Sequence, residues 1–257
     1  MAAVALHGSS TLPFGDRCSS CRLAPLCLPG ELGVEAKRQL EGITRRPRPH
    51  GRGAHLYRAG DAFGSIFAVK SGAYKTYRIS ESGELQVVGF FLPGDILGLD
   101  ALAEGLHPYS AQALETSSVC EIPFAALEGL FTSVSGLRRR VMGIMSAELI
   151  NDQEMMQTLA KRTAEERLAL MLLRFANRFA RLGLSAEHLR MPMPRSDLGN
   201  HLGLADETMS RLFARFQSRG WISAEGREIE LRDIPALVEA ARLQGVSVGL
   251  KAAPRRA

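Results

Sequence analysis

The spacing of hydrophobic positions changes along the chain, and each spacing predicts a different kind of structure. From about Ala54 to Pro123, short apolar runs alternate with glycines. Short runs at regular spacing, bounded by turn residues, predict the strands of an antiparallel roll or barrel. The clearest predicted strands are Ser65–Val69, Tyr74–Ile79 and Leu85–Phe91.

A turn signal and a later run complete the picture of this region. Ser82, Gly83 and Glu84 lie between two of the runs and predict the tip of a β-hairpin. Val119–Ile122 predicts a further strand. Because successive side chains of a strand point to opposite faces, we expect Cys120 to face away from Val119.

A long helical pattern follows the strands. From about Leu137 to Lys161, one set of mostly apolar positions recurs in alternating steps of three and four, which predicts a helix with an a/d seam. The seam consists of Met142, Met145, Leu149, Asp152, Met156 and Leu159. It indicates a coiled-coil homodimer, which the polar flanks of the seam favour over a core helix that packs on the roll. Directly after it, Thr163 and Glu166 form a capping box, which predicts that a new helix begins there.

Two short helices and a wing are predicted near the end of the chain. Ser196–Gly203 predicts a helix with Ser196 as its N-cap, and Glu207–Ser218 predicts a second helix that Gly220 ends. Trp221–Leu231 alternates like a two-stranded wing. Together these segments form a helix–turn–helix pattern.

The second of these helices has an apolar and a polar face. The apolar face consists of Met209, Leu212, Phe213 and Phe216, and the polar face of Glu207, Ser210, Arg211 and Ala214. An α-helix fits the major groove of DNA, where Arg pairs with guanine and Glu accepts from cytosine, so the polar face predicts base contacts. Arg215 and Arg219 lie beside it and are candidates for phosphate contacts. A plain helical hairpin is the alternative, but the connection, the polar face and the wing favour DNA binding.

Composition limits the size, the partner and the location. A chain of 257 residues suits two domains, and the excess of 32 Lys+Arg over 27 Asp+Glu fits a nucleic-acid partner or a basic enzyme. No stretch is apolar and long enough to cross a membrane, and residues 1–7 do not resemble a signal peptide. We therefore expect a cytoplasmic protein without a membrane partner, whose thiols stay reduced.

Three cysteines crowd the start of the chain. Cys18, Cys21 and Cys27 are spaced C-x2-C-x5-C, and Cys120 is the only other cysteine. Thiolates grouped in this way usually hold a soft metal or a cluster. The segment is broken by prolines and glycines, so a metal would supply folding energy that it lacks. Four cysteines can also hold zinc, so a zinc-stabilised, constitutive DNA-binding regulator is an alternative.

An enzyme on a small β-barrel is a further alternative, which the sequence does not favour. It contains no paired carboxylates, no nucleophile with an adjacent base and no H-x-H metal pattern that would support catalysis. Scattered histidines, each expected to be a surface or capping residue, are His50, His55, His107, His188 and His201. We therefore predict that the protein is not an enzyme.

Several motifs spread over the chain belong together. They are the cysteine spacing with the distant Cys120, Pro93-Gly94-Asp95, Ala113-Leu114-Glu115-Thr116, Ala164-Glu165-Glu166-Arg167-Leu168 and Glu207-Thr208-Met209-Ser210-Arg211. In these motifs the chain resembles the FNR branch of the Crp/Fnr superfamily, the oxygen-responsive bacterial transcription regulators. The resemblance covers nearly the whole chain, and the last motif joined to the cysteine spacing is highly specific.

The resemblance implies an α+β fold. We expect an N-terminal antiparallel β-roll like that of cyclic-nucleotide-binding proteins, a long dimerisation helix and a C-terminal winged helix–turn–helix. The expected bounds are 1–30 for a cysteine-rich cluster-binding segment, 31–135 for the sensor roll, 136–162 for the dimerisation helix, 163–245 for the DNA-binding domain and 246–257 for a disordered tail.

The resemblance also implies a function. In the family, a 4Fe–4S cluster promotes dimerisation and binding to TTGAT-type inverted repeats under anaerobic conditions, and oxygen disassembles the cluster. The implied cluster ligands are Cys18, Cys21, Cys27 and Cys120, and the implied reading residues are Glu207, Ser210 and Arg211. Many members also contact RNA polymerase, here partly through the tip Ser82-Gly83-Glu84.

Two departures from family patterns matter. Relatives that bind cyclic AMP hold its phosphate with a Glu and an Arg, but the matching positions here are Gly98-Leu99 and Tyr109-Ser110-Ala111. A buried phosphate without a cationic partner is unfavourable, so we expect no cyclic-nucleotide response. Arg22 follows Cys21 where several relatives have a smaller residue, and a cation there is expected to shift the potential of the cluster.

Asp152 suggests how the dimer is controlled. Two copies would meet near the dimer axis, where like charges repel and burial adds a desolvation cost, unless Asp152 points to water from the rim of the seam. Our hypothesis is that this repulsion keeps the monomer–dimer equilibrium close to balance. A cluster that tethers the N-terminal segment to the roll through Cys120 would rearrange the helix start around Arg138–Val141 and favour the dimer.

Overall fold

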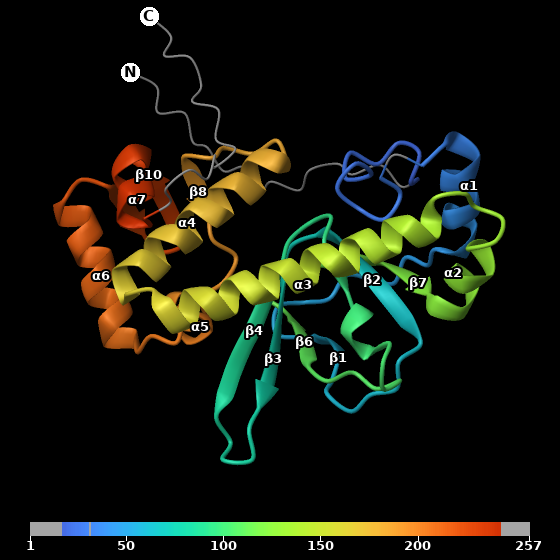
Figure 1. The fold of residues 1–257 in the computed structure, drawn as a ribbon, viewed down its shortest axis with the longest axis horizontal. Helices are drawn as coiled ribbons and strands as arrows, with labels where there is room; N and C mark the ends of the chain where they lie inside the picture. The colour runs from blue at the N-terminus through green and yellow to red at the C-terminus, as the bar shows by residue number, and fades with distance from the viewer. Residues whose placement is uncertain (1–16, 31, 243–257) are drawn as a thin grey trace, which may run out of the picture.

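The structure, a computed structural model, describes residues 17–30 and 32–242; the predicted disordered tail at 246–257 lies outside the described residues. Figure 1 shows a β-stranded region and a helical region, with the long helix α3 (Leu137–Lys161) running along both. The expected α+β architecture is confirmed. Within the described part of the chain, no helix combines the length and the apolar character that crossing a membrane requires.

Two antiparallel sheets form the roll, with strand orders β1-β6-β3-β4 and β5-β2-β7. The strands are β1 (His55–Tyr57), β2 (Ser65–Ser71), β3 (Tyr74–Ile79), β4 (Leu85–Phe91), β5 (Ile96–Leu97), β6 (Ser110–Ala113) and β7 (Ser118–Pro123). The predictions for β3 and β4 are confirmed. The strand predicted at Ser65–Val69 is longer, because after a register shift it pairs once more, between Ser71 and Ser118.

The β3–β4 hairpin projects from the roll (Figure 1). At its end, the amide of Ser80 donates to the carbonyl of Glu84 at 2.9 Å, and Gly83 has a φ of +83° that favours glycine. The predicted tip at Ser82, Gly83 and Glu84 is therefore confirmed, and all three residues are exposed.

The two faces of β7 enter different hydrophobic cores. Val119 lies in the core between the sheets, whereas Ile122 lies in a second core, against which Cys120 packs. The predicted alternation is confirmed. This second core joins β2 and β7 to the helices α1 (Val34–Ile43) and α2 (Phe124–Leu130) and to the start of α3.

The long helix α3 has the predicted bounds and is mostly uncovered. Its buried residues are Leu137, Val141 and Thr158. The next helix, α4 (Ala164–Arg181), begins with the predicted capping box: Thr163 Oγ1 accepts from the amide of Glu166 at 3.3 Å, and Glu166 Oε2 accepts from the amide of Thr163 at 2.9 Å.

The C-terminal region is a winged helix–turn–helix. Its remaining elements are β8 (His188–Arg190), α5 (Arg195–His201), α6 (Asp206–Ser218), β9 (Ile222–Glu225), β10 (Glu228–Leu231) and α7 (Ile234–Ala240). The predicted wing is confirmed, since β9 and β10 pair as a hairpin.

The ends of α5 and α6 differ in part from the predictions. Ser196 is not the N-cap of α5, because the extended residue Pro194 precedes the helix and no side chain caps it. The second helix begins at Asp206, one residue before the predicted start. It ends as predicted: the amide of Gly220, with φ +72°, donates to the carbonyl of Gln217 at 2.9 Å.

Candidate metal centre and DNA-binding surface

The four cysteines come from two distant parts of the chain and line one cavity. Cys18, Cys21 and Cys27 lie on the turns of residues 17–30, and Cys120 lies on β7. The cavity measures about 40 Å³. Its other walls include Ala24, Leu40, Arg46, Ala68, Lys70 and Ile122. The structure thus brings together all four predicted ligands in a mostly apolar enclosure.

Burial raises the pKa of the Cys18, Cys27 and Cys120 thiols. Desolvation is the main cause, and it raises the pKa of Cys18 to about 11 and that of Cys27 to about 12, with Cys120 raising both further. Burial also raises the pKa of Cys120, although Arg46 and Lys70 act in the opposite direction. These three thiols are therefore protonated at neutral pH, and binding of a metal or a cluster would release protons.

The donor set fits an iron–sulfur cluster. Four cysteine sulfurs are the usual ligands of a 4Fe–4S cluster, and they also suit structural zinc. All four cysteines are free thiols. Among residues 17–30 and 32–242, no three His, Cys, Asp or Glu side chains are arranged as ligands of a single metal ion. The structure instead shows one cavity that all four cysteine thiols line. The cation of Arg22, beside Cys21, is exposed.

The helix α6 turns its polar face to solvent. The predicted reading residues Glu207, Ser210 and Arg211 are exposed. The opposite face, formed by Met209, Leu212, Phe213 and Phe216, is buried in the core of the C-terminal region. A helix with one face anchored and the other free has the shape needed to enter a major groove.

Two arginines beside this face are ion-paired within the domain. Arg215 Nη1 lies 3.0 Å from Glu165 Oε2, and Arg219 donates to Oε1 of the same carboxylate. Partial burial acts to raise the pKa of Glu165, but the hydrogen bonds and charges of the two arginines outweigh it and lower that pKa. Sequence reasoning missed this pairing, and phosphate contacts by these arginines would compete with it.

Most of the predicted dimer seam is exposed. Relative exposures of 61%, 41%, 59% and 63% are found for Met142, Met145, Leu149 and Met156. An apolar row of this size on one helix marks an interaction surface. Asp152 is also exposed, and it lies where the seam meets a cavity of about 620 Å³ between the roll, α3 and α4. Leu159 is partly covered.

A polar junction fastens α5 to the β3–β4 hairpin; we call it the domain junction. Lys75 Nζ lies 2.8 Å from both carboxylate oxygens of Asp197, and these side chains are only 10% and 15% exposed. Asn200 donates to the carbonyl of Leu85 at 2.7 Å and accepts from the amide of Val87 at 2.6 Å. Sequence reasoning missed these contacts.

Two histidines are buried, so the expectation that each histidine is a surface or capping residue is wrong for them. His201 is 9% exposed, and its Nδ1 lies 3.2 Å from the carbonyl oxygen of Val87 in the domain junction. His107 is 3% exposed and stacks on Tyr57 inside the roll, with ring centroids 3.7 Å apart. Desolvation lowers the pKa of both imidazoles.

Comparisons with known proteins decide the family. Residues 47–133 match the cyclic nucleotide-binding domain, and residues 166–240 match the Crp-like helix-turn-helix domain. The chain is 50% identical over 216 residues to the transcriptional activator protein anr of Pseudomonas aeruginosa, which covers 84% of this chain and 88% of that protein. The chain belongs to the FNR branch of the Crp/Fnr superfamily.

Other Crp/Fnr proteins support the same assignment. Identity to the fumarate and nitrate reduction regulatory protein of Escherichia coli is 43% over 224 residues, which are 87% of this chain and 90% of that protein. The solved structure of FixK2 from Bradyrhizobium japonicum matches with a TM-score of 0.71 and 27% identity, over 77% of this chain and 97% of that chain. The family relation makes this Crp/Fnr chain a DNA-binding transcription regulator, and its relatives are regulators rather than enzymes.

Proposed function

We propose that this Crp/Fnr protein is an oxygen-sensing transcription regulator that uses a 4Fe–4S cluster. The observation that carries the proposal is that thiols from residues 17–30 and from β7 line one cavity. Cys18, Cys21, Cys27 and Cys120 would hold the cluster. When bound, the cluster supplies an oxygen-labile iron–sulfide core that ties the N-terminal segment to the roll.

Dimerisation would follow from the exposed seam of α3. In a homodimer, Met142, Met145, Leu149 and Met156 become covered by the same residues of a second copy, which removes apolar surface from water. Asp152 opposes this association, because burial acts to raise its pKa and a second carboxylate adds repulsion. The dimer would therefore depend on the tether that the cluster provides.

The dimer would bind a palindromic promoter site. Its two-fold symmetry matches an inverted repeat of TTGAT-type half-sites, which the family resemblance suggests. Glu207, Ser210 and Arg211 would contact bases, and Arg215 would contact a phosphate after leaving Glu165. The exposed tip at Ser82–Glu84 would contact RNA polymerase. We expect no cyclic-nucleotide response, because neither a Glu nor an Arg occupies Gly98-Leu99 or Tyr109–Ala111.

Anaerobic purification tests the proposal. The expected protein is brown, contains iron and sulfide, and shifts a TTGAT palindrome before exposure to air but not after it. Replacement of any of the four cysteines by serine should abolish both the colour and the anaerobic shift. A colourless protein that contains zinc and binds DNA equally in air would instead support the zinc-stabilised regulator.

The role of Asp152 has its own test. Asp152→Ala removes the repulsion, so this variant should dimerise in air without the cluster, as measured by sedimentation. A variant that stays monomeric would show that the carboxylate does not control the dimer.

A further inference from the structure

Arg140 connects the cysteine segment to α3. Its Nη2 donates to the carbonyl oxygen of Cys27 at 2.8 Å and lies 3.4 Å and 3.5 Å from the carbonyl oxygens of Leu26 and Pro25. Three carbonyl groups next to one cysteine thus converge on a single guanidinium. A charged donor makes stronger hydrogen bonds than a neutral one, so these contacts hold the segment effectively.

The chain beyond Cys27 packs around the same side chain. A Cβ atom at Gly30, which has a φ of +41°, would lie 2.9 Å from Arg140 Nε. Leu28 is buried in one core with Leu137 and Val141 of α3. The segment around Cys27 and the first turns of α3 therefore form one packed unit; we call it the cysteine junction.

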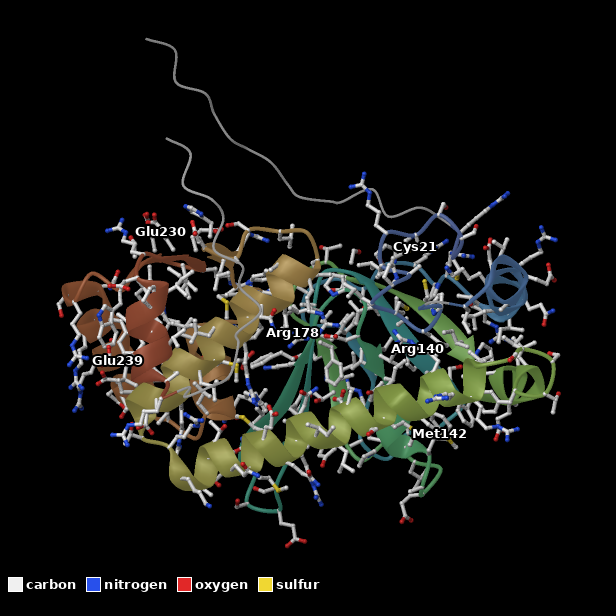
Figure 2. The ribbon with its side chains drawn as sticks, turned by 45° about the horizontal axis from the view of Figure 1, so that its top comes forward. Cys21, Arg140, Met142, Arg178, Glu230 and Glu239 are labelled. Carbon is white, nitrogen blue, oxygen red and sulfur yellow. The ribbon has the colours of Figure 1, made fainter. Side chains whose placement is uncertain are left out.

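The dimer seam begins on the opposite side of the same turns. Residues two apart on an α-helix are rotated by about 200° about its axis. Figure 2 accordingly shows Arg140 on the side of α3 that faces the segment carrying Cys21, and Met142 on the other side. A movement of Arg140 therefore moves the helical turn that presents Met142 and Met145 to a second copy.

We propose that Arg140 is the positioning residue that couples the cysteine segment to the dimer seam. The inference rests on the proposed cluster. A cluster that holds the Cys27 sulfur fixes the carbonyl groups of residues 25–27, and these fix Arg140 and the start of α3. Without a cluster the carbonyl groups lose their fixed arrangement, and the guanidinium exchanges them for water.

The test compares Arg140→Met with Arg139→Met, since Arg139 is an exposed neighbour on the same helix. Dimer dissociation constants are measured by anaerobic sedimentation for each protein with its cluster and after removal of the cluster. The cluster-loaded Arg140→Met protein should dimerise roughly tenfold more weakly than the parent, because it loses a charged hydrogen-bond donor. Its cluster-free form should match the cluster-free parent, and Arg139→Met should match the parent in both states.

This design separates coupling from a merely structural role. A structural role would weaken the dimer equally with and without the cluster, and that result overturns the inference. Failure of Arg140→Met to take up the cluster, seen as lost visible absorbance, also overturns it, because Arg140 would then shape the site itself. If the parent protein dimerises equally with and without the cluster, the result contradicts the proposed function rather than the specific role of Arg140.

Two further variants probe the same contact. Gly30→Ala retains every thiol and the Arg140 side chain, but its Cβ atom would crowd the guanidinium and strain the backbone at a φ of +41°, so it should shift Arg140 and weaken the loaded dimer in the same way. Arg140→Lys retains a cation that reaches fewer carbonyl groups, so it should recover part of the coupling. Full parental coupling in both Gly30→Ala and Arg140→Met would exclude the role of Arg140.

Discussion

Two junctions join separate parts of the chain by different contacts. At the cysteine junction, Arg140 of α3 binds backbone carbonyl groups of a segment, residues 17–30, that forms turns only. At the domain junction, Lys75 of β3 binds Asp197 of α5, and Asn200 pairs with the backbone of β4. The first set of contacts involves an irregular segment, whereas the second involves regular elements on both sides.

Because of this difference, we expect the contacts of the cysteine junction to be conditional and those of the domain junction to be permanent. Helices and strands keep their shape through their own hydrogen bonds, but an irregular segment with few such bonds opens locally at a low free energy. We therefore expect the cysteine junction to depend on what the thiols hold. We expect the domain junction to be independent of the cluster, so that cluster binding would change the start of α3 while α5 stays on the hairpin.

Leu137→Ala gives the largest expected effect on the cysteine junction. Leu137 is 0% exposed in the second core, so its truncation should lower the free energy of unfolding by about 3–5 kcal/mol, measured by urea titration. Leu127→Ala is the matched control, because Leu127 is equally buried in this core but belongs to α2. Both should destabilise the roll, yet only Leu137→Ala should weaken the cluster-dependent dimer. Equal dimer affinity in both variants would show that the packing of Leu137 in the second core does not control dimerisation.

Lys75→Met should break the domain junction at the next largest cost. It leaves Asp197 nearly buried without its cation, so we expect a loss of about 2–3 kcal/mol in unfolding free energy. Lys75→Met combined with Asp197→Leu should recover at least half of this loss, because no unpaired charge remains. Strictly additive losses would show that the two side chains are not coupled in solution.

The sequence predicted the parts of the fold that have local signals. The bounds of β3, β4 and α3 follow from hydrophobic spacing, and the start of α4 follows from its capping box. The sequence did not predict the short strands β1, β5 and β8, because two or three residues are too few to show a hydrophobic period. Ser196 was assigned as a cap because its residue type suits one, whereas the extended Pro194 sets the start of the helix.

The candidate site divides in the same way. Cysteine spacing and the polar face of α6 are local patterns, and from them we predicted the thiols that line one cavity and the face of α6 that is exposed. Arg140 lies 113 residues from Cys27, and Lys75 lies 122 residues from Asp197. Such contacts leave no pattern along the chain, because the fold alone brings their partners together.

Glu165→Gln tests a contact within the DNA-binding domain and should have a smaller effect. The substitution weakens the hold on Arg215 and Arg219, so non-specific DNA affinity at low salt should rise roughly fivefold, with a salt dependence steeper by about one phosphate contact. Glu35→Gln on α1 is the control, since it makes the same change in net charge and also leaves an arginine, Arg38, without its partner. Equal gains in both variants would indicate a general charge effect.

His201→Gln should have the smallest effect and concerns the pH dependence of the domain junction. Burial lowers the pKa of His201 below 6.5. The cations of Arg174 and Arg178 also lower it, whereas the hydrogen bond with the carbonyl of Val87 acts to raise it. The unfolded chain therefore takes up the proton first as the pH falls through about 6.5, so the native state loses stability below that pH. We expect this contribution to stay under about 1 kcal/mol between pH 7.5 and 5.5 and to disappear in His201→Gln, as measured by thermal unfolding.

Because His201 lies far from the cysteines along the chain, the same loss should occur with and without the cluster. A pH dependence that changes with cluster content would mean that the two junctions are coupled, and the comparison between them would fail.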